Sequence, residues 1–104
     1  MNTSNYAEIS ELIRQHARKA NRSDIDSIMK ILSKGDLPVT RFVDFHLGRV
    51  TNPEGLKRIE HYLFKGDQIQ RNYAALFFER RNEWKIVNEA YKLGLIDWVQ
   101  AYSR

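Results

Sequence analysis

The chain has 104 residues, of which 42% are hydrophobic and 29% are charged, and its formal net charge is +4. This composition is typical of a folded globular protein and excludes an intrinsically disordered one, and the length fits a single domain over residues 1–104. Because the sequence has no cysteine, disulfides, thiolate nucleophiles and cysteine-based zinc sites are excluded.

The N-terminal residues are polar, and no apolar run follows them that would act as a signal peptide. The longest apolar runs, such as residues 74–78, are far too short to cross a membrane. We therefore expect a cytoplasmic protein that does not insert into a membrane.

Apolar residues recur at helical spacing from the N-terminus onward, and helix start and stop signals separate the runs. The first predicted helix covers residues 5–20, with Thr3 or Ser4 as its N-cap. The second is capped by Ser23 and ends before Gly35, which we expect in the left-handed conformation that often closes a helix.

Four more helices follow with comparable signals. The third begins near Pro38 and ends at Gly48, and the fourth opens with Asn52 followed by proline. Asp67 caps the fifth, whose surface is apolar nearly all round and which should therefore be buried between neighbours. The sixth covers residues 83–93. The sequence thus predicts an all-α chain of five to seven short antiparallel helices.

Two of the predicted helix junctions resemble each other. Residues 32–36 read LSKGD and residues 63–67 read LFKGD, 31 positions later, and a weaker third version occupies residues 93–97. Periods near 30 residues with two helices each are typical of helical repeat arrays. The alternative is an irregular helical bundle, in which glycine followed by aspartate is simply a good helix end and a good helix start.

The second junction resembles a HEAT-type repeat. Asp67 at the turn, Arg71 four residues on and the small pair Ala74–Ala75 match that family's pattern, whereas Gln70 departs from it. The resemblance extends over residues 53–94. It implies an array of paired helices, or α-α superhelix, and such arrays chiefly serve as binding scaffolds.

Two structural expectations follow for the fifth helix. Arg71 lies on an apolar-rich helix, so we expect a structural role in which it meets Asp36, Asp67 or carbonyl groups. Residues of common helical phase on three consecutive helices should form one core cluster: Ile59, Leu63, Tyr73, Leu76, Phe77, Ile86 and Ala90.

No motif in the sequence indicates catalysis. The three histidines, His16, His46 and His61, are not spaced as metal ligands, and there is no phosphate-binding glycine loop. His16 lies between apolar residues and is expected to be a half-buried structural histidine. We therefore predict no catalytic residue, no cofactor and no metal site.

Basic residues gather in two places. One is a row at every fourth position near the end of the first helix, and the other surrounds a tryptophan: Arg14, Arg18 and Arg22, and Arg80, Arg81, Trp84 and Lys85. Such groups can bind phosphates and stack bases. They can equally be solvated helix faces that complement helix dipoles.

The C-terminal end carries Trp98 and Tyr102, four residues apart on a short helix expected from Asp97. Tryptophan and tyrosine are enriched where interfaces are strongest. This end therefore predicts docking to a partner or to a second copy of the chain in a homodimer. The alternative is that the tail folds back onto its own core.

Two functions remain open after the sequence analysis. The first is a non-enzymatic helical scaffold that binds another protein or itself, and the second is a basic nucleic-acid-binding helical domain. The charge is mild and evenly spread, since each half of the chain carries +2, and strong nucleic-acid binders usually concentrate theirs.

Overall fold

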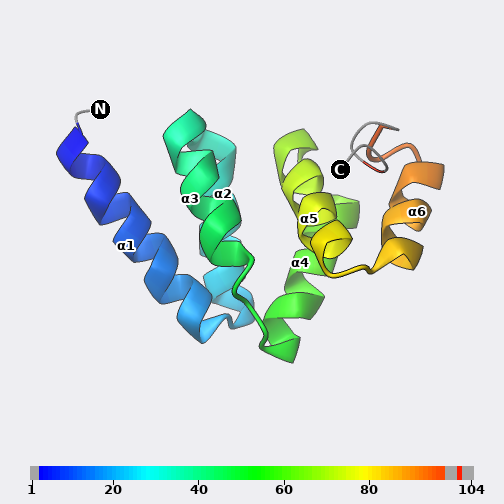
Figure 1. Cartoon of the computed structure of the whole chain (residues 1–104), viewed down its shortest axis with the longest axis horizontal. Helices are drawn as coiled ribbons and strands as arrows, with labels where there is room; N and C mark the ends of the chain where they lie inside the picture. Colours follow the sequence, from blue (N-terminus) through cyan, green and yellow to red (C-terminus); the bar gives the residue numbers. More distant parts are fainter. Residues whose placement is uncertain (1–2, 98–100, 102–104) are drawn as a thin grey trace. The chain divides into compact units, whose positions relative to one another are not determined.

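The computed structural model describes residues 3–97 and 101, with side chains from residue 5 onward. Within this part every regular element is an α-helix, which confirms the predicted all-α class, and no helix is long and apolar enough to cross a membrane. The helices are α1 (Thr3–Lys19), α2 (Arg22–Lys34), α3 (Leu37–Leu47), α4 (Pro53–Lys65), α5 (Gln68–Arg80) and α6 (Trp84–Lys92) (Figure 1).

The chain divides into two compact units, Met1–Arg58 and Ile59–Arg104, and the boundary falls within α4. In the first unit α1, α2 and α3 each pack against the other two, and in the second unit α5 packs against α6. The expectation of a single domain stays a prediction.

The helices of the first unit are amphipathic, and their apolar faces supply its core. Apolar residues three or four positions apart share one side of a helix, so packing two or three such sides together removes them from water. Each large aliphatic side chain buried in this way contributes about 1.5–3 kcal/mol. Those with almost no exposed surface are Ile13, Ile25, Ile28, Met29, Leu32, Val43, Leu47 and Val50.

The end of α1 is fixed by the side chain of Asn52. Ala20 has a left-handed φ of 52°, which terminates α1. Asn52 Nδ2 donates to the carbonyl oxygens of Lys19 (3.1 Å) and Ala20 (3.0 Å), while its Oδ1 accepts from the N–H of Glu54 (3.1 Å). One amide thus satisfies polar groups at the end of α1 and at the start of α4, which have no partner within their own helices.

The first turn of α4 lies so close to this junction that only glycine fits at position 55. A Cβ atom on Gly55 would lie 2.6 Å from the Ala20 carbonyl oxygen and 3.0 Å from a methyl group of Val50. A backbone oxygen cannot move aside as a flexible side chain can, so this contact limits how α1 and α4 approach each other.

We expect Gly55→Ala to destabilise the protein by about 1–3 kcal/mol, because the added methyl group overpacks the junction. Gly48→Ala is the matched control: Gly48 has a φ of −59°, and a Cβ there would come no closer than 3.5 Å to the neighbouring carbonyl oxygens. That change should stay within about 0.5 kcal/mol. Urea denaturation measures both, and a Gly55→Ala protein as stable as the wild type would contradict the steric argument.

The two similar junctions of the sequence share their local structure. Each contains an aspartate that caps the following helix: Asp36 accepts from the N–H of Val39 (3.3 Å) and Asp67 from the N–H of Gln70 (2.9 Å). The Gln70 side chain accepts in return from the N–H of Asp67 (2.8 Å), which completes a capping box. The residue that departs from the HEAT pattern therefore has a capping role here.

Two of the predicted N-caps are wrong. α1 already includes Thr3 and Ser4, so neither residue precedes it as a cap. The N-cap of α2 is Asn21 rather than Ser23. The physical reason is Asp24, whose carboxylate accepts from the Asn21 N–H at 3.1 Å and so starts the helix two residues earlier than expected.

The prediction for Gly35 is also wrong, because its φ of −83° is an extended conformation that any residue adopts. Glycine is needed there for space instead, since a Cβ would lie 2.5 Å from a methyl carbon of Val39. The left-handed helix end occurs at Gly94, where φ is 76°, and Leu95 N–H then donates to the Ala90 carbonyl oxygen (3.0 Å).

In the second unit the C-terminal half of α5 is buried on all sides, since every residue from 74 to 79 is buried, whereas residues 68–73 keep part of their surface in solvent. Phe77 is 4% exposed, and Ile59, Leu63, Leu76 and Ala90 are buried with it, whereas Tyr73 and Ile86 keep part of their surface in solvent.

Arg71 has the structural role that the sequence suggested. Its guanidinium donates to the carbonyl oxygens of Leu95 (2.8 Å) and Gly66 (2.8 Å) and to the amide oxygen of Gln68 (2.9 Å). The acceptors are therefore carbonyl groups rather than the carboxylate of Asp36 or Asp67. They join the turn between α4 and α5 to the segment after α6.

Candidate functional site

A pocket of about 240 Å³ lies in the first unit, between α1 and the segment that follows α3. Three of its lining residues are arginines and one is a histidine, so we refer to it as the basic pocket. It is lined by Arg14, Ala17, Arg18, Ala20, His46, Arg49, Thr51 and Asn52.

The local sequence explains how the basic pocket forms. Arg14 and Arg18 are four residues apart and share one side of α1. Beside them the wall of the pocket is made by Ala17 and Ala20, both nearly buried, whose short side chains leave the space unfilled. Arg49 lines the pocket from the segment that directly follows α3.

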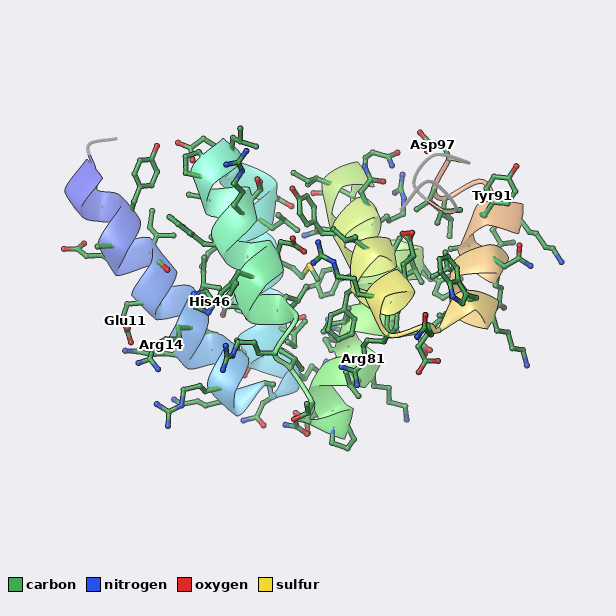
Figure 2. All side chains as sticks on the ribbon, in the orientation of Figure 1. Glu11, Arg14, His46, Arg81, Tyr91 and Asp97 are labelled. Atoms are coloured by element: carbon green, nitrogen blue, oxygen red, sulfur yellow. The ribbon has the colours of Figure 1, made fainter. Side chains whose placement is uncertain are left out.

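Arg14 is the most constrained of the three arginines. Its Nη2 and Nε donate to the carboxylate of Glu11 at 2.5 Å and 3.0 Å, and the hydrogen bond from Arg14 lowers the pKa of Glu11. Figure 2 shows Glu11 and Arg14 extending from α1, with His46 between α1 and α3. Both partners are nearly half exposed, so this ion pair stabilises the fold little. It does neutralise one positive charge at the edge of the pocket.

Arg18 and Arg49 keep their charges uncompensated. Neither forms an ion pair with any residue in the described part of the chain. Arg49 lies over the ring of Phe45, with its guanidinium carbon 5.9 Å from the ring centre, and an aromatic ring attracts a cation without cancelling its charge. Two guanidinium groups at one pocket therefore remain available to an anion.

His46 lies beside these arginines, and its surroundings disfavour the protonated ring. Burial is the main cause of its lowered pKa, and the positive charges of Arg14 and Arg49 lower that pKa further, while Glu11 opposes them. Ser10 Oγ lies 3.4 Å from its Nε2. An anion entering the basic pocket would oppose the two arginine charges and so favour protonation of the ring.

The structure places Arg22 apart from Arg14 and Arg18. It lines a second, wider hollow beside the carboxylates of Asp26 and Glu54, and its backbone N–H donates to Glu54 at 2.7 Å. The row of arginines expected from the sequence is therefore divided between a basic and a mixed-charge environment.

The other predicted binding residues belong to the second unit or lie outside the described residues. Arg80, Arg81, Trp84 and Lys85 are exposed around the end of α5 and the start of α6, and the Arg81 guanidinium lies 5.2 Å from the ring centre of Phe77 (Figure 2). The C-terminal pair Trp98 and Tyr102 lies outside the described residues, so docking through this end stays a prediction.

Sequence reasoning found two arginines of the basic pocket, Arg14 and Arg18, and missed Arg49 and His46. Arg49 is a single cation after a helix end, and His46 is one of three scattered histidines. Only the packing of α1 against α3 unites these residues with the first two, and no spacing in the sequence encodes that packing.

A histidine–aspartate pair in the first unit was also missed. His16 Nδ1 lies 2.8 Å from Asp24 Oδ1, and Asp24 is 7% exposed. The pair resembles part of a hydrolytic triad, but no hydroxyl group of the described residues is hydrogen-bonded to the other ring nitrogen. It joins α1 to the first turn of α2, which is the structural role expected of His16.

We expect this pair to make the free energy of unfolding depend on pH in the acid range. Burial alone would raise the pKa of Asp24, but the hydrogen bonds from His16 and the Asn21 N–H outweigh it and the pKa is lowered. Because the pKa of Asp24 is lower in the folded protein than the unfolded value of 3.8, the ionised carboxylate stabilises the fold at pH values above 3.8. This stabilisation is lost as the pH falls through the folded-state pKa.

Asp24→Asn should therefore destabilise the protein at pH 7, by about 1–3 kcal/mol, and by less at each step below pH 3.8. Urea denaturation of both proteins over this range measures the difference. A difference that stays constant down to the acid limit would contradict the assignment.

Groups of three histidine, aspartate or glutamate side chains that could hold a metal ion are absent from residues 3–97 and 101. Comparison of the chain with protein-family models, with curated proteins and with solved structures finds no match. The resemblance to HEAT repeats stays a prediction.

Proposed function

We propose that this chain is a non-catalytic helical module that binds another protein, and that the basic pocket receives an anionic group of that partner. The observation that carries the proposal is the convergence of Arg18 and Arg49, both without an acidic partner in the described part of the chain, on one small pocket. Helical scaffolds of the kind that the sequence resembles commonly bind proteins.

Three observations favour a protein partner over nucleic acid. Three arginines of the first unit converge on a compact pocket rather than forming a stripe, and Arg22, which would extend the row, lies beside Asp26 and Glu54. The net charge is only +4. A nucleic-acid backbone is a long line of phosphates, and binding to it requires several cations spaced along it.

The proposal is tested by selecting ligands for the purified chain from a displayed library of random peptides. We expect the selected peptides to be acidic, because two uncompensated guanidiniums attract carboxylates in a partly desolvated pocket. The double variant Arg18→Gln/Arg49→Gln should weaken their binding at least about tenfold, which corresponds to about 1.4 kcal/mol. Fluorescence anisotropy measures each affinity.

Arg22→Gln is the matched control, since it removes the next arginine of the row but leaves the basic pocket intact; binding should be unchanged. Labelled single-stranded and double-stranded oligonucleotides are measured in parallel at several salt concentrations. Tighter binding to an oligonucleotide than to any peptide, falling steeply with salt, would replace the proposal with nucleic-acid binding. Selected peptides that bind the double variant normally would also contradict it.

A further inference from the structure

The donors of the basic pocket outnumber the oxygens of a carboxylate. Asn52 is committed to the carbonyl oxygens at the end of α1, and Arg14 is partly committed to Glu11. Arg18 and Arg49 are not, and each guanidinium offers five N–H donors in a planar fork. A carboxylate has two oxygens and can be satisfied by one such fork, whereas a phosphate group presents three oxygens that two forks can share.

The charge of the site matches a phosphate group as well. Three arginines and one glutamate leave a formal charge of +2 around the basic pocket while His46 is neutral. A phosphorylated side chain carries a charge of about −1.5 to −2 at pH 7, against −1 for a carboxylate. A carboxylate would leave the two free guanidiniums only half neutralised.

We infer that the basic pocket binds the phosphate group of a phosphorylated side chain of the partner protein, with Arg18 and Arg49 as its principal donors. This inference rests on the proposed function and specifies the chemistry of its ligand. Phe45, which is 63% exposed and lies against Arg49, offers an apolar contact for residues that flank the phosphorylated one.

His46 makes phosphate binding sensitive to pH. The charged groups that act on its ring are Arg14 and Glu11 from α1 and Arg49 from the segment after α3. A bound dianion opposes the two arginine charges, so the pKa of His46 should rise on binding and the ring should take up a proton. By linkage, the site then binds a given anion more tightly as the pH falls through the range in which His46 titrates.

The experiment is an NMR titration of the wild-type chain with inorganic phosphate, with inorganic sulfate and with acetate at matched ionic strength. The ring signal of His46 is assigned with the variant His46→Gln. We expect phosphate and sulfate to shift the side-chain N–H signals of Arg18 and Arg49 and to raise the pKa of His46, and acetate to do so far less. Phosphate itself gains a proton in this pH range, whereas the charge of sulfate does not change. The pH dependence of sulfate binding therefore reports the contribution of His46 alone.

Variants separate the basic pocket from general charge attraction. Arg18→Gln and Arg49→Gln should each weaken phosphate binding about tenfold or more, as expected for the loss of charge-assisted hydrogen bonds, whereas Arg22→Gln should leave it unchanged. Equal responses to acetate and phosphate, or an equal loss in Arg22→Gln, would overturn the inference. Circular dichroism of each variant verifies that it is folded.

The source of the phosphate is distinguished with a matched set of ligands: one selected peptide with phosphoserine, with serine or with aspartate at the same position, and an oligonucleotide. We expect the phosphoserine peptide to bind most tightly. Equal affinity of the aspartate and phosphoserine peptides would refute the phosphate inference but leave the proposed function standing. Phosphate binding with no peptide binding would refute the proposed function instead, and tighter binding of the oligonucleotide would assign the site to nucleic acid.

Discussion

The geometry of the first unit depends on one side chain, the amide of Asn52. It donates to the last carbonyl groups of α1 and accepts from the first turn of α4, so a single residue determines where one helix ends and another begins. An apolar side chain at this position would remove the side-chain partner that these polar groups of both helix ends now share. The contact of Gly55 with Ala20 then leaves little freedom in how the two ends meet.

The basic pocket is a consequence of this junction. Its lining includes Ala17 and Ala20 from the end of α1 and Thr51 and Asn52 from the segment that enters α4, so the residues that fix the junction also form part of the site. Arginines gather there although they repel one another, and burial together with two of them lowers the pKa of His46. Such an arrangement disfavours protonation of His46 in the folded protein. Charge placement that is unfavourable for stability is typical of binding sites, where stability is traded for affinity.

The sequence is a good guide to the helices and a poor guide to the site, for one physical reason. A helix end is determined mainly by the residues next to it. Pro53, Asp67 and Gly94 therefore predict the helix boundaries at their positions through their own backbone and side-chain chemistry. The errors arise where a local choice is decided by a neighbour: Asp24 moves the start of α2 to Asn21, and contact with Val39 rather than backbone conformation requires Gly35. The basic pocket depends on non-local contacts even more than these helix ends do, because Arg49 and His46 join Arg14 and Arg18 only through tertiary packing.

The first helix carries a structural contact and a wall of the basic pocket on different sides. His16 lies two residues from both Arg14 and Arg18, which on an α-helix places it on a different side from them. On its own side it meets the carboxylate of Asp24 and ties α1 to α2, while the arginines line the basic pocket opposite α3. Ile13 and Ala17, both buried, separate the two sides. Each histidine of the first unit thus has its own surroundings: His16 lies beside the carboxylate of Asp24, and His46 lines the basic pocket among arginines. The side of α1 that lines the basic pocket and the side that ties it to α2 are therefore separate surfaces of one helix.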